Sequence, residues 1–194
     1  QLSREPEITI VGMGYVGLTL AAVMAERGFQ VLGVEQDTKL LESLNRSEPH
    51  FHEPGLKAIM RNHLGRNLFM SSVMPQEPWD VYIIAVGTPW DPEKERPVIE
   101  HVERAAKQVA SCYHPDALVV VRSTVPVGTS RQTVLPILQE KASRVLLASC
   151  PERTAEGIAL QELRELPQII GGLDEESTDR AQEVFRHVTH TSIE

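Results

Sequence analysis

Three glycines near the N-terminus have the spacing of a phosphate-binding turn. The segment of residues 12–17, GMGYVG, fits the pattern GxGxxG and stands between a short β-branched run and a helical pattern. The first glycine permits a tight turn, the second leaves room for a pyrophosphate, and the third lets the helix pack closely on the strand. The N–H groups and partial positive charge of a helix N-terminus favour an anion. The residues expected to contact a dinucleotide here are Gly12, Gly14, Tyr15, Val16 and Gly17.

A carboxylate follows this turn at the spacing that dinucleotide-binding sites use. Glu35 ends the second apolar run, close to the expected ~20 residues after the last glycine. Its carboxylate is able to accept hydrogen bonds from both adenosine ribose hydroxyls and would repel a 2′-phosphate. Gln36 adds no positive charge, so the pattern favours NAD over NADP. The alternative is that the glycines only make a turn and that Glu35 is a solvated residue at a strand end.

The apolar pattern places these residues in an alternation of strands and helices. Unbroken Val, Ile and Leu runs are typical of parallel strands covered by helices on both faces. We therefore expect an α/β fold of the Rossmann-like, doubly wound type, with a mainly parallel sheet in a single domain, residues 1–194. Pro136 should kink or shorten one helix, and residues 89–97 read as a charged loop. Strands are predicted at 8–11, 31–34, 68–70, 81–86, 118–121, 145–148 and 168–170, and helices at 15–27, 38–45, 55–64, 99–112, 128–139 and 177–187.

Composition narrows the class of protein. The chain has 194 residues, of which 41% are hydrophobic and 24% charged, and this excludes collagen-like, coiled-coil and disordered chains. No run approaches the ~20 apolar residues of a membrane span, and no signal-peptide block precedes the first strand. The net charge of −8 argues against nucleic acid as a partner. Cys112 and Cys150 show neither metal-ligand nor disulfide spacing, so we expect a cytoplasmic protein without a metal site.

Five further motifs give the chain a specific resemblance. After GMGYVGL come EPGL, VGTP, STVPVGT, CPERTAEG and IIGG, which begin at Glu53, Val86, Ser123, Cys150 and Ile169. In this order they resemble the nucleotide-sugar 6-dehydrogenases, the UDP-glucose/GDP-mannose dehydrogenase family. Arg153, in the PERT form of the CPER element, resembles the branch that oxidises UDP-N-acetylhexosamines such as UDP-N-acetylmannosamine.

The resemblance implies a reaction and roles for several residues. The family oxidises a sugar C6 alcohol to a carboxylate, reduces two NAD, and holds the aldehyde stage on a cysteine. Thr124 would help to position the catalytic water, Glu152 would line the substrate and nicotinamide site, and Glu156 would be a candidate general base. The alternatives are a helix cap for Thr124 and exposed loop positions for both carboxylates. Thr88 and Pro89 would border the cofactor near the nicotinamide ribose, and Gly87 and Thr124 are further residues expected to bind the cofactor.

Parts that the resemblance implies are missing from this chain. The family enzymes are about twice as long, and their second half carries the catalytic lysine, the nucleophilic cysteine, most UDP contacts and the dimer helix. Neither Cys112 nor Cys150 fits the nucleophile. We therefore expect an NAD-binding half that binds NAD but does not turn over a UDP-sugar. In the full-length enzyme we expect a homodimer, formed through the central helix that this chain lacks. The alternatives are a 6-phosphogluconate-dehydrogenase-like or β-hydroxyacid oxidoreductase and a stand-alone nucleotide sensor or interaction module.

The histidines and Glu53 are interpreted as structural rather than catalytic residues. The seven histidines form no ligand pattern with nearby carboxylates and are interpreted as solvated or capping residues. Glu53, in EPGL, is interpreted as a loop or helix-start residue rather than a catalytic one.

Overall fold

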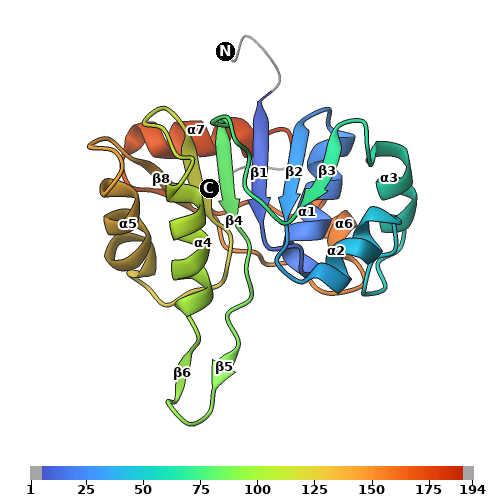
Figure 1. The fold of residues 1–194 in the computed structure, drawn as a ribbon, viewed down its shortest axis with the longest axis horizontal. Coiled ribbons are helices and arrows are strands. Elements are labelled where there is room, and N and C mark those ends of the chain that lie inside the picture. The colour runs from blue at the N-terminus through green and yellow to red at the C-terminus, as the bar shows by residue number, and fades with distance from the viewer. Residues whose placement is uncertain (1–5, 190–194) are drawn as a thin grey trace.

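The computed structural model describes residues 6–189, and its centre is a sheet of seven strands in the order β3-β2-β1-β4-β7-β8-β9 (Figure 1). All neighbours pair in parallel except β8 and β9, which are antiparallel. The chain leaves β1 in one direction to β2 and β3 and returns to build the other half from β4, which is the doubly wound arrangement. The strands are β1 (Glu7–Val11), β2 (Gln30–Val34), β3 (Leu68–Ser71), β4 (Val81–Ile84), β7 (Leu118–Val121), β8 (Leu146–Ser149) and β9 (Gly171–Gly172).

Helices cover both faces of this sheet, as the unbroken apolar strands predict. Ile8 and Ile10 face one hydrophobic cluster with residues of α1, α3, α6 and α7, whereas Val11 faces a second cluster with α4 and α5. The predicted α/β, doubly wound fold is therefore confirmed. The helices are α1 (Tyr15–Glu26), α2 (Thr38–Asn45), α3 (Leu56–His63), α4 (Glu100–Ala110), α5 (Leu135–Gln139), α6 (Ala159–Glu165) and α7 (Glu175–Phe185).

The structure differs from the predicted elements in two helical segments. The helix expected over residues 128–139 is a π-helical segment, η1 (Ser130–Val134), followed directly by α5. Pro136 lies in the first turn of α5, where its missing N–H costs little, so the helix continues through it. The sequence analysis did not predict α6, whose preceding residue, Ile158, supplies no side-chain cap.

The last predicted strand is also displaced. Residues 168–170 were expected to form it, but pairing with β8 occurs at Gly171 and Gly172. Gln168 forms a single β-bridge rather than part of a strand. Its side chain is turned inward, where Oε1 accepts a hydrogen bond from Arg122 Nη1 at 2.7 Å.

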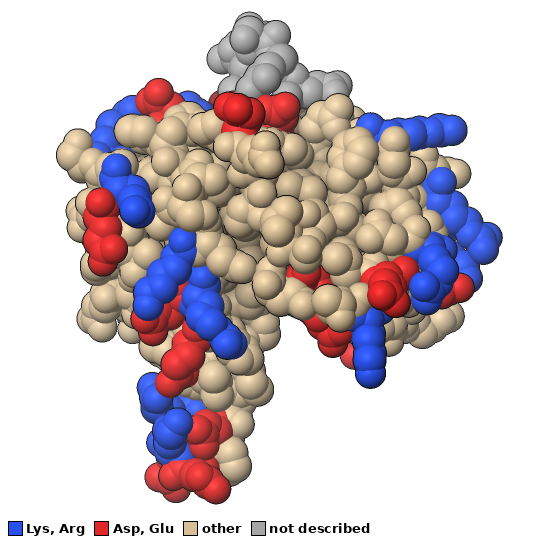
Figure 2. All heavy atoms as spheres, in the orientation of Figure 1, with Lys and Arg blue, Asp and Glu red and all other residues tan. Residues whose placement is uncertain are grey.

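A two-stranded hairpin replaces the expected charged loop at residues 89–97. It pairs β5 (Trp90–Asp91) with β6 (Arg96–Pro97) and projects from the body of the molecule beside α4 (Figure 1). Figure 2 shows acidic and basic side chains gathered on this hairpin, whereas the middle of the same face is largely uncharged. Within residues 6–189, no helix has the length and apolarity that a membrane crossing requires.

Candidate functional site

The glycine turn joins β1 to α1 at the carboxyl edge of the sheet. Gly12 has φ +96°, and a Cβ placed there would lie 2.9 Å from the carbonyl oxygen of Ala85. A Cβ on Gly17 would lie 1.8 Å from the carbonyl oxygen of Gly12, so α1 packs directly on the turn. Both positions therefore require glycine for backbone geometry and close packing.

Gly14 differs from these two glycines, because the folded chain itself leaves room for a side chain there. It precedes α1, and a Cβ added there would meet no atom within 4 Å, so the space in front of it is open. No side chain of the described residues caps this helix. Its first N–H groups therefore remain available to an anion, because they have no partner within the helix.

A cavity of about 670 Å³ opens in front of this turn. The predicted residues Gly12, Gly14, Glu35 and Gly87 line it from the carboxyl ends of the strands, and α4 forms the opposite wall with residues that include His101 and Arg104. The volume is within the range of small-molecule sites, and the site lies where the strand order reverses at β1 and β4. The open space, the uncapped helix and the adjacent carboxylate together fit a dinucleotide.

Glu35 is held by the backbone around it. Its Oε2 accepts from the N–H of Met13 at 3.0 Å, and its Oε1 accepts from the N–H groups of Gln36 at 2.8 Å and Asp37 at 2.9 Å. A carboxylate has about four acceptor positions, so one remains for a ribose hydroxyl. The second hydroxyl that the sequence analysis assigned to Glu35 would have to displace a backbone donor.

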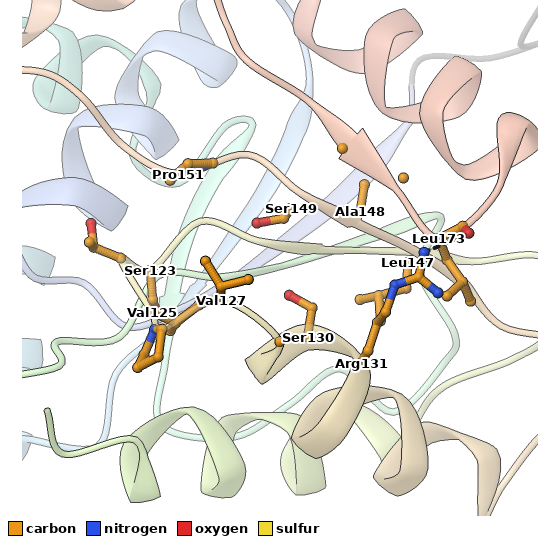
Figure 3. A pocket seen from close by; sticks show the side chains of 15 residues that line it. Ser123, Val125, Val127, Ser130, Arg131, Leu147, Ala148, Ser149, Pro151 and Leu173 are labelled. Atoms are coloured by element: carbon orange, nitrogen blue, oxygen red, sulfur yellow. Dashed lines mark hydrogen bonds between the residues drawn. The ribbon is translucent and has the colours of Figure 1, made fainter. Parts of the chain in front are cut away.

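A second cavity, of about 560 Å³, lies between η1 and the β8–β9 edge, and Thr124 lines it. Figure 3 shows Ser130 and Arg131 on η1 opposite Ser149 and Ala148 of β8. Thr124 is tied to the first cavity's rim, because its carbonyl oxygen accepts a hydrogen bond from Thr88 Oγ1 at 2.7 Å. The structure therefore brings two predicted site residues, Thr88 and Thr124, into contact.

The carboxylate of Glu152 is nearly buried and ion-paired. Its Oε2 accepts a hydrogen bond from Nη2 of Arg122 at 2.6 Å, and its Oε1 accepts from the backbone N–H groups of Arg153 and Thr154. Nη1 of Arg122 also donates to the carbonyl oxygen of Cys150 at 3.0 Å. Sequence analysis missed Arg122, although a charged residue directly after a buried apolar run is a signal for such a site.

The remaining predicted residues are placed in different ways. Glu156 is exposed on the loop that follows Glu152. Val16 lies in the first turn of α1, and the carbonyl oxygen of Pro89 accepts from the N–H of Val98 at the base of the hairpin. Tyr15 directs its hydroxyl away from the turn, where it donates to the carbonyl oxygen of Ala155 at 2.6 Å.

Both cysteines are free, and burial raises the pKa of each thiol. Cys150 is fully buried against Arg122, and Cys112 is partly buried just after α4. Such thiols are poor nucleophiles. Within residues 6–189, no cluster of three potential metal ligands is present.

Comparison with known sequences identifies related proteins. The family profile described as UDP-glucose/GDP-mannose dehydrogenase family, NAD binding domain, matches residues 6–189. UDP-N-acetyl-D-mannosamine dehydrogenase of Campylobacter jejuni is 30% identical over 191 residues, which cover 93% of this chain and 47% of that protein. NDP-N-acetyl-D-galactosaminuronic acid dehydrogenase of Ralstonia nicotianae is 33% identical over 189 residues, which cover 92% and 44%.

Comparison with solved structures agrees. The UDP-N-acetyl-mannosamine dehydrogenase from Staphylococcus aureus superimposes with a TM-score of 0.89 and 29% identity, over 96% of this chain and 46% of that one. The chain thus spans about half the length of the curated relatives that it matches.

Proposed function

We propose that this chain is the cofactor half of a nucleotide-sugar 6-dehydrogenase. The premise is that the chain belongs to the UDP-glucose/GDP-mannose dehydrogenase family, whose NAD-binding domain it matches. The complete reaction would oxidise the C6 alcohol of a UDP-sugar to the uronate with two NAD. The observation that carries the proposal is the cavity at the uncapped start of α1, which Gly12, Gly14 and Glu35 line together.

Different residues of this chain would bind different parts of NAD. The free N–H groups at the start of α1 would hold the diphosphate, and Glu35 would accept a hydrogen bond from the adenosine ribose. Thr88 and Pro89 would border the nicotinamide ribose, and Gly87 and Thr124 would complete the contacts with the cofactor. When bound, NAD supplies the hydride acceptor for the oxidation.

Three side chains are proposed for the chemistry beside the cofactor. Thr124 would orient a water molecule, and Glu152 would face the substrate and nicotinamide site as a carboxylate that Arg122 holds in one orientation. Glu156 is the proposed general base, since it is an exposed carboxylate on the same loop and is free to take a proton. Domain closure in a longer protein would raise its basicity by removing water.

The proposed substrate is a UDP-N-acetylhexosamine. The PERT segment that contains Arg153 supports it, and so does the name of the Campylobacter jejuni relative. Neither cysteine of this chain suits the nucleophile, since Cys150 is buried against Arg122 and Cys112 is partly buried with a raised thiol pKa. We therefore assign the nucleophilic cysteine to a second half of the protein, together with the catalytic lysine and the dimer contacts. We place the activity in the cytoplasm, in keeping with two free cysteines.

Titration calorimetry of the 194-residue chain with NAD and with NADP tests the proposal. We expect saturable NAD binding and at least about tenfold weaker NADP binding, a difference of about 1.4 kcal/mol, because Glu35 repels a 2′-phosphate. Incubation with NAD and UDP-N-acetylmannosamine, UDP-N-acetylglucosamine or UDP-glucose should produce no NADH absorbance. Absence of NAD binding would refute the cofactor assignment, and NADH production would refute the division into two halves.

A further inference from the structure

Glu53 is a nearly buried carboxylate that the proposed chemistry does not use. Only 6% of its surface is exposed, and it lies on the segment that leads into α3. An ionised carboxylate in such a place is stable only if hydrogen-bond donors surround it. The groups around its carboxylate all come from segments far away in the sequence, so Glu53 connects segments that are separate in the chain.

Two of these donors belong to the loop that carries the proposed catalytic carboxylates and to the helix that follows it. Oε2 of Glu53 accepts from the N–H of Gly157 at 3.0 Å, and Oε1 accepts from the N–H of Leu160 at 3.1 Å. Leu160 lies in the first turn of α6, which has no side-chain cap from its own preceding residue. Glu53 therefore caps α6 from a distance and interacts favourably with the positive end of its dipole.

A third contact of Glu53 reaches the cofactor turn. Tyr15 is the first residue of α1, directly after Gly14, and its hydroxyl lies 3.4 Å from Oε2 of Glu53. The same hydroxyl donates to the carbonyl oxygen of Ala155 at 2.6 Å. A tyrosine hydroxyl is protonated at neutral pH, and burial with the nearby Glu53 charge raises the pKa of Tyr15 further, to about 12.

These contacts join two functional segments through two side chains. The loop of residues 152–157 is fixed at its start by the pairing of Glu152 with Arg122 and at its end by Glu53. Between these points, the Tyr15 hydroxyl holds the loop at the carbonyl oxygen of Ala155, and Tyr15 directly follows Gly14. A loop opening would have to break the Tyr15 contact, and a displacement of the first turn of α1 would loosen the loop.

We propose that Glu53 and Tyr15 are positioning residues that couple NAD binding at the glycine turn to the order of the carboxylate loop 152–157. The inference rests on the proposed function, in which the diphosphate of NAD lies on the start of α1. A bound diphosphate restrains the first turn of α1 and so favours the loop position that Tyr15 and Glu53 hold. Because coupling is reciprocal, an ordered loop in turn favours NAD binding, so loss of the Tyr15 hydroxyl should weaken NAD binding as well as loop protection.

Amide hydrogen exchange of the 194-residue chain, measured by NMR with and without saturating NAD, tests the coupling. In the wild type we expect NAD to slow exchange at Gly157 and Leu160 at least about fivefold, the lower range of coupling between sites. In Tyr15→Phe the slowing should fall below about twofold, and calorimetry should give a correspondingly weaker NAD affinity. Tyr113→Phe, which removes a tyrosine hydroxyl outside this site, should behave as the wild type.

The second variant separates positioning from general stability. Without NAD, Glu53→Gln should speed exchange at Gly157 and Leu160 about tenfold, equivalent to one lost charge-assisted hydrogen bond, and leave Val120 in β7 unchanged. Glu42→Gln, at an exposed carboxylate on α2, is the matched control.

Three outcomes would overturn the coupling. The first is full NAD protection of the loop in Tyr15→Phe, and the second is equal acceleration of Gly157, Leu160 and Val120 in Glu53→Gln, which is the sign of a purely structural role. Either result with normal wild-type NAD binding leaves the proposed function intact. A wild-type chain that binds no NAD overturns the function and the coupling together.

Discussion

Arg122 and Glu152 form a buried ion pair at the carboxyl ends of two neighbouring strands, with Nη2 and Oε2 2.6 Å apart. Their side chains are 0% and 6% exposed. Arg122 also lies 5.3 Å from the centre of the Phe185 ring, and Gln168 accepts from its Nη1. Because both terminal nitrogens of this buried guanidinium are hydrogen-bonded, the pair holds the Glu152 carboxylate in a single orientation.

Removal of Arg122 should therefore be costly. Arg122→Met leaves the Glu152 carboxylate without its buried counterion and should lower the free energy of unfolding by about 3–5 kcal/mol. Urea denaturation measures this loss, and the double variant Arg122→Met/Glu152→Gln should recover part of it. Arg144→Met, which removes exposed ion pairs with Asp116 and Glu176, is the control and should cost at most about 1 kcal/mol. An equal loss of unfolding free energy for both arginine variants would show that the buried pair stabilises the fold no more than exposed pairs do.

Two glycines of the cofactor turn should respond to alanine in opposite ways. Gly17→Ala forces a Cβ to within 1.8 Å of the Gly12 carbonyl oxygen, so it should destabilise the fold by at least about 1–3 kcal/mol. Gly14→Ala meets no atom and should keep the wild-type stability, but its methyl group occupies the space proposed for the diphosphate. Thermal unfolding and calorimetry separate the two effects. Wild-type NAD affinity in Gly14→Ala would place the diphosphate elsewhere.

Glu35→Ala should weaken NAD binding by about 1–2 kcal/mol, the value of a charge-assisted hydrogen bond. The variant also removes the acceptor for the N–H of Met13, so the turn itself should become less ordered. Calorimetry measures the affinity for NAD, and NADP serves as the second ligand. We expect the preference for NAD over NADP to shrink, because the charge that repels a 2′-phosphate is gone. An unchanged NAD affinity would exclude Glu35 from the ribose.

The stability of the fold should depend on Tyr15 at high pH. Its pKa is raised from 10.0 to about 12 in the folded chain. Between these values the unfolded chain releases the phenol proton and the folded chain retains it, so stability is lost as the pH rises from about 10 to 12. Denaturation of wild type and Tyr15→Phe across this range isolates the effect from the other tyrosines. Parallel stability curves for the two proteins would contradict the shifted pKa.

Local pattern in the sequence was sufficient for the framework. The apolar runs around Ile8, Val31, Ile83 and Val120 predicted the parallel strands, because a strand covered on both faces needs apolar residues at successive positions. The glycine turn was also local, since it lies within one strand–turn–helix segment. The local pattern missed α6, because the side chain that caps this helix belongs to Glu53, in a distant part of the sequence.

The tertiary structure alone decided which charged side chains meet. Glu53 lies 104 residues from Gly157 and Arg122 lies 30 residues from Glu152, and no local spacing relates these positions. They come together because the order of strands and the packing of α6 bring the loops at the carboxyl edge into contact. Burial then removes water from these charges, so each needs a partner whose identity only the folded chain determines.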